Sequence, residues 1–328
     1  MVGYIVRRVL WIIPVLVFVS LITFTMMHAA PGGPWAREKH LLARTVELLN
    51  VKYNLDEPVF IQYLNWVGPL QFNDGALKTD DNGGIVFGGL LAGDLGPSYR
   101  YTERGVNDVV SDGLGTTFHL GIMAFLLSVL VGVPLGIVGA LQHNKIPDYI
   151  ATFLSVIGIA TPSFVASILL LVFFSVTLGW LPTHGWDGWD NPRAMVLPTV
   201  ALSLYPVAQI SRFTRASMLE VTRKDYVRTA QSKGLKGRTI VWAHMLRNAL
   251  IPVVTILGPV LAALITGSFI IETIFTIPGI GRYYVQSIGQ RDYGVIMAVT
   301  ILYAVAIAGL NLVVDVLYAY IDPRIRYS

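Results

Sequence analysis

The chain has 328 residues, of which 54% are hydrophobic and 13% are charged. Soluble domains carry about 25% charged residues, so this chain has too little charge to cover the surface of a water-soluble protein of its length. The net charge of +4 is modest and gives no indication of nucleic-acid binding, and the absence of cysteine excludes disulfides and thiolate metal sites.

The first apolar run, Val9–His28, is long enough to cross a bilayer, because a hydrocarbon core about 30 Å thick needs about 20 apolar residues in a helix. Arg7 and Arg8 precede it, as basic residues precede the core of a signal peptide. The run is longer than such a core, however, and is followed by only a weak cleavage match. We interpret residues 1–28 as a cytoplasmic N-terminus and a retained first transmembrane helix.

Residues 29–116 follow as a long outer loop in which acidic residues outnumber basic ones. Loops of this length are usually functional or disordered. Leu48–Val67 mixes aromatic, aliphatic and polar residues, which predicts a small ordered subdomain. Two roles stay open for this extracytoplasmic region: a lid over the outer ends of the spans, or a docking surface for a protein that delivers substrate.

Five further apolar segments bring the predicted number of transmembrane helices to six. They lie within Thr117–Leu141, within Tyr149–Trp186, at Ala194–Ser211, at Asn248–Ile271 and at about Tyr293–Tyr318. The fourth span of the six is short and contains Pro198 and Pro206, which neighbouring helices can accommodate. Residues 117–328 are therefore expected to form an all-α membrane core.

A basic segment at 212–250, the coupling loop, separates the fourth and fifth spans. Nine of its residues are Lys or Arg, and only Glu220 and Asp225 are acidic. The positive-inside rule places such a loop, and with it both termini, in the cytoplasm. Asp225–Gly234 is predicted to be a helix that Gly234 ends through a positive φ, and Lys236–Leu250 a second helix.

The coupling loop could bind lipid, nucleic acid or a protein. Basic loops bind anionic lipid headgroups without specificity, but that attraction alone does not require two helices separated by a glycine. Nucleic-acid binding is excluded by location, since the flanking spans hold the loop at the bilayer. A helical pair at the membrane surface favours a cytoplasmic protein partner.

Several motifs resemble a known family of permeases. Asp225–Gly234 reads DYVRTAQSKG, and His244–Pro252 follows it as HMLRNALIP. Further motifs occur in the same order as in that family, at Gly93–Gly96, Pro162–Phe164, Leu178–Pro182, Glu272–Phe275, Pro278–Gly281, Arg291–Tyr293 and Asp322–Arg326. Over nearly its whole length the chain resembles the first permease subunit of the oligopeptide, dipeptide and nickel ABC importers.

The resemblance implies a type I ABC-importer permease fold in a bacterial inner membrane, with one chain forming half of a translocation pathway for oligopeptides or dipeptides. It implies a second, homologous permease subunit, a pair of cytoplasmic ATPase subunits and an extracytoplasmic solute-binding protein as partners, with membrane lipid around the spans. Nickel or another small solute stays open as the cargo of the same scaffold, because nothing in the spans indicates a substrate.

The same resemblance implies that one segment of the coupling loop contacts an ATPase subunit. The residues concerned are Asp225, Tyr226, Arg228, Thr229, Ala230, Lys233 and Gly234. Many importers carry an acidic residue where this chain has Arg228, so a contact between that acid and an ATPase arginine is not transferred. Asp225, one turn earlier, is the candidate replacement.

The sequence contains no ATPase site of its own. Gly234–Thr239 is basic and contains glycines but lacks the spacing of a phosphate-binding loop. Ion-coupled transporters commonly keep ionisable residues within the spans, whereas here only Glu272 and Asp315 come near span depth. A membrane-embedded enzyme or receptor is the alternative class, but neither a His-Glu-x-x-His motif nor paired intramembrane aspartates occur. No cofactor is expected, and no metal site either, because the histidines show no ligand spacing.

Five residues are candidates for the translocation path, namely His119, Pro162, Gly267, Ser268 and Glu272. Each of the main candidates also has a structural explanation. Pro162 could kink the third span, His119 could donate a hydrogen bond between helices, and Glu272 could pair with Arg282 or Arg291 near the membrane interface. Gly267 belongs to a set of small residues that would allow close helix packing.

Overall fold

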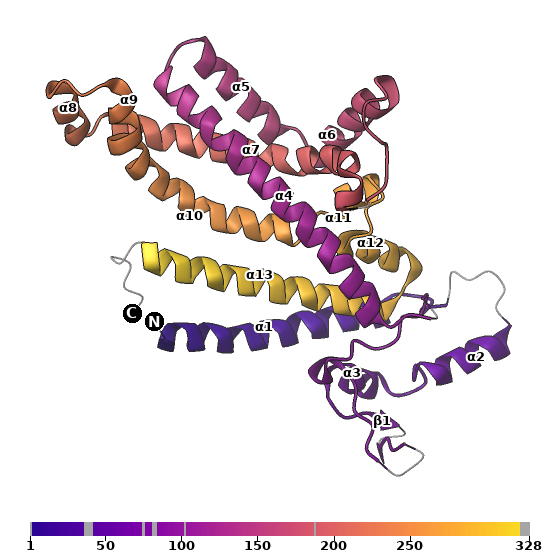
Figure 1. Ribbon diagram of the computed structural model, residues 1–328. Coiled ribbons are helices and arrows are strands. Elements are labelled where there is room, and N and C mark those ends of the chain that lie inside the picture. The colour runs from indigo at the N-terminus through magenta and orange to yellow at the C-terminus, as the bar shows by residue number, and fades with distance from the viewer. Residues whose placement is uncertain are drawn as a thin grey trace. The chain divides into compact units, whose positions relative to one another are not determined.

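The structure is a computed structural model that describes residues 2–35, 42–73, 76–80, 84–101, 103–186 and 188–321. It is mainly helical (Figure 1). The chain forms two compact units, the first made of residues 1–115 and 278–308 and the second of residues 116–277 and 309–328. The terminal motif Asp322–Arg326 lies outside the described residues.

The first unit contains α1 (Val2–Ala29) and most of the region expected as an outer loop. That region folds into α2 (Ala43–Lys52), α3 (Val59–Val67), a 3₁₀ turn η1 (Leu90–Ala92) and a small antiparallel sheet of β1 (Phe72–Asn73) and β2 (Ala76–Leu77). The sheet pairs Phe72 with Leu77 and Asn73 with Ala76. Helices α2 and α3 therefore lie where the composition of residues 48–67 predicted a small ordered subdomain.

The core of the first unit is rich in aromatic and long apolar side chains. Phe24 and Met27 of α1 pack against Tyr293, Ile296 and Met297 at the start of α13 (Tyr293–Ile321). The hydroxyl of Tyr293 also donates to the Met27 carbonyl at 3.0 Å. Contacts between residues so distant in sequence fix the start of α13 within this unit.

The Arg291–Tyr293 motif has a structural role in the first unit. Arg291 ends α12 (Ile280–Gln290) in a left-handed conformation, with φ of 59°, and donates to the backbone carbonyls of Pro31 and Gly33. Asp292 is fully buried and accepts hydrogen bonds from the Ser98 hydroxyl and the Tyr99 amide. The motif thus ties the α12–α13 turn to the segment between α1 and α4.

Helix α4 (Val106–Leu141) begins well before Thr117, where the second span was expected to start. Its polar first turn is stabilised by hydrogen bonds: Asp108 accepts from the Gly105 amide, and Asn107 accepts from the Leu95 amide and donates to the Gly93 carbonyl. The Gly93–Gly96 motif is therefore hydrogen-bonded to the first turn of α4. Hydropathy could not locate this start, because the capped turn is polar.

The second unit holds the remaining helices, and α7 packs against both α5 and α10 (Figure 1). In chain order these are α5 (Ile146–Ala160), α6 (Ser163–Leu170), the π-helical η2 (Leu171–Thr177), the 3₁₀ turn η3 (Gly188–Asp190), α7 (Pro192–Thr222), α8 (Asp225–Ser232), α9 (Gly237–Thr239), the π-helical η4 (Ile240–Met245), α10 (Leu246–Ile265) and α11 (Phe269–Ile274).

Five helices of the described residues are long and apolar enough to cross a membrane, and the number is six if the bent pair at 146–160 and 163–177 counts as one span. The helix axis bends by 108° between the two halves of that pair. Thr161 between them is extended, with φ of −85° and ψ of 118°, because the proline that follows disfavours helical backbone. The kink predicted at Pro162 is thus a complete break.

One predicted span and one predicted loop helix have different boundaries in the structure. Helix α7 extends 31 residues from Pro192 to Thr222, with Pro198 and Pro206 inside it, so the expectation of a short fourth span was wrong. The second loop helix begins near Lys236 as expected but does not end at Leu250. Instead, α9, η4 and α10 follow one another without interruption to Ile265.

Candidate functional site

The predicted coupling helix is present as α8, and it ends as the sequence indicated. Asp225 lies in its first turn, where a negative charge favourably meets the amino end of the helix. Gly234 directly follows Lys233, the C-cap residue of α8, and has a φ of 70°. A Cβ placed on Gly234 would meet nothing within 4 Å. The position therefore requires glycine because of its backbone conformation and not because of crowding.

Helix α8 has one buried and one exposed face. Val227 is fully buried and Ala230 is 5% exposed, and both pack in a cluster with Met218 and Val221 of α7 and Met245 of η4. The exposed residues are Asp225, Tyr226, Arg228, Thr229, Lys233 and Gly234. Six of the seven predicted coupling residues can thus meet a partner, whereas Ala230 anchors the helix to its own chain.

An exposed ion pair precedes the coupling helix. Lys224 Nζ lies 3.0 Å from Glu220 Oε1, one helical turn away, and more than half of each side chain is exposed. The hydrogen bond from Lys224 to Glu220 raises the pKa of the ammonium group above its usual value. The pair joins the last turn of α7 to the residue that directly precedes α8.

Two of the predicted path residues, Pro162 and Ser268, lie at one cavity. This first cavity, of about 490 Å³, opens at the α5–α6 break and is lined by parts of α5, α6, α7 and α10 and by residues 268 and 271. Its polar lining comes from Thr161, Ser163, Tyr205, Gln209 and Ser268. The break at residues 161–162 therefore exposes polar groups among otherwise apolar helices.

A second cavity, of about 740 Å³, continues along α5 and α7. It shares Ile159, Tyr205 and Gln209 with the first cavity and reaches Arg212 and Arg215 near the end of α7. The sequence analysis did not identify Tyr205 or Gln209. A polar residue on a proline-containing apolar helix was the available signal, but only the helix packing shows that both residues face the cavities.

Gly267 and Glu272 do not line these two cavities but stabilise the break between α10 and α11. A Cβ at Gly267 would lie 2.4 Å from Thr117 Cγ2 and 2.6 Å from Glu272 Oε1, and its φ is 85°. Glu272 is fully buried and accepts from the Thr117 hydroxyl at 3.1 Å. Ser268 caps α11 by accepting from the Ile271 amide. The close packing expected at Gly267 is confirmed.

His119 lies on α4 between two tryptophans. Its ring is 4.9 Å from that of Trp189 and 5.6 Å from that of Trp186, the latter in an edge-to-face arrangement. Within the part of the chain that the structure describes, its buried Nε2 has no hydrogen-bond partner. Ring contacts therefore replace the hydrogen bond between helices that the sequence suggested.

The sequence analysis also missed a buried ion pair between Asp148 in the first turn of α5 and Arg215 of α7. An acidic residue just after Lys145 and Pro147 was a signal for a helix start. The identity of its partner was not accessible, because Arg215 is 67 residues away in sequence and had been counted only as one charge of the coupling loop.

Comparison with known proteins places the chain in a family. Residues 132–327 match the family described as binding-protein-dependent transport system inner membrane component, and residues 1–121 match the N-terminal membrane component of such systems. The chain is 40% identical over 327 residues to the oligopeptide transport system permease protein OppB of Salmonella typhimurium, covering 100% of both. It is 39% identical over 326 residues to the dipeptide transport system permease protein DppB of Bacillus subtilis, covering 99% of this chain and 98% of that protein.

Two solved structures of ABC transporters share the fold of part of this chain. An amino acid ABC transporter aligns with a TM-score of 0.53 at 18% identity, over 65% of this chain and 94% of the other. An inward-facing MetNI methionine ABC transporter aligns with a TM-score of 0.54 at 17% identity, over 65% and 96% respectively. Identity this low shows a shared fold and nothing about substrate.

Membership of such a family implies an ATPase partner and a substrate-binding protein partner. The permease subunit itself is not an enzyme, and ATP hydrolysis belongs to the ATPase partner. The apolar helices agree with a multi-pass protein of the bacterial inner membrane. The chain belongs to the binding-protein-dependent transport system inner membrane components, as an ABC-importer permease subunit of the oligopeptide and dipeptide type.

Proposed function

We propose that this chain is one of two homologous permease subunits that together enclose the pathway of an ATP-driven importer of oligopeptides or dipeptides. The names of its full-length relatives, an oligopeptide and a dipeptide permease protein, support this substrate class. The proposal includes cytoplasmic termini, two cytoplasmic ATPase subunits that contact α8, and an extracytoplasmic binding protein that delivers the peptide to the outer side, where we place residues 29–116.

The chemistry of the first cavity is the observation that carries the peptide assignment. Its described lining is apolar with hydroxyl and amide groups and contains no carboxylate and no imidazole. Peptides of varied sequence share only their backbone, which uncharged donors and acceptors such as Tyr205 and Gln209 can bind without selecting a side chain. Imidazole is a protein ligand that suits nickel, and the described lining contains none. The cavity therefore favours a peptide over a metal ion.

The two faces of α8 suggest which part of the chain receives the movement of the ATPase subunits and which part responds to it. Its buried face packs on α7 and η4, so a force applied to its exposed face is passed to the spans. Asp225 lies on the exposed face and is available to an arginine of an ATPase subunit. In the proposal, residues 212–250 receive the displacement, and residues 117–328 convert it into opening and closing of the path.

Reconstitution tests this function directly. The chain is purified with its second permease and ATPase subunits, placed in proteoliposomes with the binding protein, and supplied with ATP and either labelled dipeptides, labelled oligopeptides or ⁶³Ni²⁺. Peptide uptake that requires both ATP and the binding protein is expected. Uptake of nickel without uptake of peptide would overturn the substrate assignment. ATP hydrolysis by the purified chain alone would overturn the assignment of hydrolysis to partner subunits.

Orientation has a separate test, which the absence of cysteine makes simple. Lys233→Cys introduces a single thiol on the exposed part of the coupling loop. A membrane-impermeant maleimide is expected to label it in inside-out vesicles but not in intact cells. Labelling from the outside of intact cells would contradict the proposed cytoplasmic position.

A further inference from the structure

The turn between α4 and α5 contains a buried carboxylate. Asp148 lies in the first turn of α5, and its side chain is 3% exposed. Its Oδ2 accepts from the Asn144 backbone amide at 2.9 Å, and Asn144 adopts a positive φ of 59° where the chain reverses. The carboxylate therefore closes the turn, while its second oxygen is available to another element.

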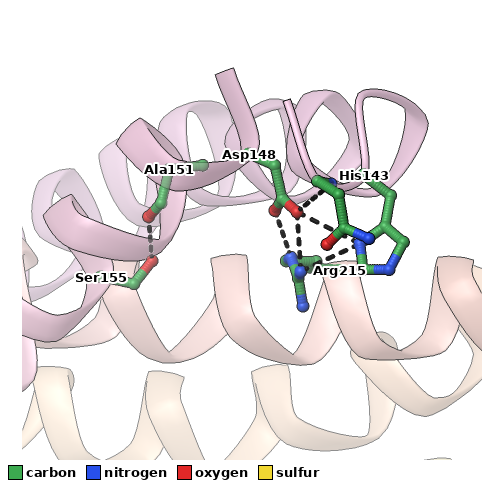
Figure 2. Close-up of polar contacts among 6 residues, drawn as sticks. His143, Asp148, Ala151, Ser155 and Arg215 are labelled. Carbon is green, nitrogen blue, oxygen red and sulfur yellow. Dashed lines mark hydrogen bonds and ion pairs between the residues drawn. The ribbon is translucent and has the colours of Figure 1, made fainter. Parts of the chain in front are cut away.

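Arg215 of α7 binds both oxygens of this carboxylate (Figure 2). Arg215 Nε lies 2.5 Å from Oδ1, and Nη2 lies 2.9 Å from Oδ2. Two parallel hydrogen bonds fix the orientation of the guanidinium as well as its distance. The ring of His143 completes the cluster, since Nδ1 is 3.2 Å from Asp148 Oδ2 and 3.3 Å from Arg215 Nη2.

Burial distinguishes this ion pair from Glu220–Lys224, which is exposed at the end of α7. The exposed fraction is 3% for the Asp148 side chain and 29% for Arg215, but 71% for Glu220 and 51% for Lys224. Removing charges from water is costly, so a buried pair contributes little net stability, and its best-attested use is to fix how elements are aligned. Here the aligned elements are α5 and α7.

Close helix crossings surround the pair. A Cβ at Gly139 of α4 would lie 3.4 Å from both Arg215 Cδ and Asp148 Oδ1. A Cβ at Gly158 of α5 would lie 2.9 Å from the Cβ of Ala208 on α7. Helices α4, α5 and α7 are therefore in contact, and the two hydrogen bonds tie the first turn of α5 to Arg215 on α7.

The aligned helices connect the coupling helix to the first cavity. Helix α7 ends at Thr222, two residues before α8. Val227 and Ala230 of α8 share an apolar cluster with Met218 and Val221 of α7 and with η4, the element that α8 mainly contacts. Helix α5 leads in the other direction to the break at Thr161 and Pro162, which line the first cavity. A displacement of α8 can thus reach the cavity through α7 and α5 if these two helices keep their alignment.

We propose that Arg215 and Asp148 are positioning residues that make α5 and α7 move as one rigid body with the coupling helix, so that movement of α8 changes the first cavity. This inference rests on the proposed function, because it assigns a mechanical role within ATP-driven transport. It predicts that loss of the ion pair separates ATP hydrolysis from transport without preventing hydrolysis.

The decisive variant is the double substitution Asp148→Asn/Arg215→Gln. It leaves no unpaired buried charge, so the chain is expected to fold and assemble, but it replaces the forked ion pair with weaker neutral groups. Spin labels are attached to Phe153→Cys on α5, which is 63% exposed, and to Arg223→Cys at the end of α7. In the otherwise wild-type complex the distance between labels should be the same without nucleotide and with ATP, and in the double variant it should change or broaden with ATP.

Transport is measured on the same complexes. The double variant is expected to hydrolyse ATP at close to the wild-type rate but to transport about tenfold less peptide per ATP, a typical size for coupling between sites. Arg215→Lys, which keeps the charge but not the fork, should lie between the two. Arg193→Gln removes an exposed charge from the start of the same helix, outside the coupling loop, and should match the wild type in both measurements.

These measurements separate the two proposals. A wild-type complex that transports another solute in place of peptide would overturn the proposed function, while the distance measurement would still test the ion pair. An ATP-independent distance between the labels in the double variant, together with wild-type transport per ATP, would overturn the role of Asp148 and Arg215. If the double variant does not assemble, the same measurements are made on Arg215→Lys. An ATP-independent distance between the labels and wild-type transport per ATP in that variant would likewise overturn the role of the ion pair.

Discussion

Two places in the second unit depend on glycine for opposite reasons. At Gly136 of α4 the backbone is helical and the difficulty is space, because a Cβ would lie 2.5 Å from the Ser211 carbonyl oxygen and 2.6 Å from Thr214 Cβ on α7. At Gly234 the surroundings are empty and the difficulty is φ, which is 70°. The α4–α7 crossing is therefore a site where substitution disturbs folding, whereas the α8 turn is a site where substitution disturbs the direction of the chain.

The comparison shows how stability and coupling are distributed. Gly132 and Gly136 let α4 approach α7 so closely that a side-chain atom has no room. The α8 end of the unit is attached through an apolar cluster and leaves its other face exposed. We expect the effects on stability to decrease in the order of the four substitutions below, while the effects on transport do not follow that order.

Gly136→Ala should have the largest effect on stability. The new methyl group meets backbone that cannot move independently, so we expect destabilisation by about 3 kcal/mol, the upper part of the range for overpacking. Thermal unfolding of the purified chain in detergent measures it. Gly115→Ala on the same helix is the matched control, because a Cβ there meets nothing within 4 Å. It should be neutral or stabilising by about 0.5–1 kcal/mol. Equal stability of the two variants would show that the crossing is not tight.

Val227→Ala should have the second largest effect and act locally. Two buried methyl groups are lost from a fully buried side chain, which costs about 2 kcal/mol including the cavity. Hydrogen exchange of the α8 amides should become faster while that of α7 is unchanged. Thr229→Ala on the exposed face of α8 is the control and should leave the exchange as it is. An unchanged exchange rate in Val227→Ala would mean that the buried face does not hold α8 in place.

Gly234→Val should have a smaller effect on folding but a large effect on transport. A left-handed conformation costs an L-residue about 1–2 kcal/mol, so the turn is expected to adopt another path and misdirect α8. ATP-driven uptake should fall strongly, while thermal unfolding of the spans changes little. Gly234→Asn should retain more uptake than the valine variant, because asparagine tolerates this conformation better. Wild-type uptake in Gly234→Val would contradict the coupling role of the turn.

Glu220→Gln should have the smallest effect. The Glu220–Lys224 pair is exposed and joins the last turn of α7 to a residue four positions later, and exposed pairs contribute little to stability. Because the pair raises the pKa of Lys224, its contribution is present at neutral pH and disappears as the pH rises through that pKa. The variant should lower the pKa of Lys224, measurable by NMR of labelled lysine, without a detectable change in thermal stability. A clear loss of stability would mean that Glu220 has a role beyond this pair.

The sequence by itself determined the features that depend on local chemistry. Apolar length located the spans approximately, the positive φ that glycine permits placed the end of α8 at Gly234, and the motif order indicated the permease family. Pro162 was recognised as a point of irregularity, because proline restricts the residue before it wherever it occurs. Each of these follows from a few neighbouring residues.

Only the tertiary structure decided which face of each element is used. It buried Ala230, made Gly136 and Ser211 neighbours, extended α4 back to Val106 through its capped first turn, and joined Asp148 to Arg215. Such contacts join residues tens of positions apart, and many residues of each type would satisfy the same local pattern. Partner choice is therefore set by the packing of whole helices, which hydropathy and residue spacing do not specify.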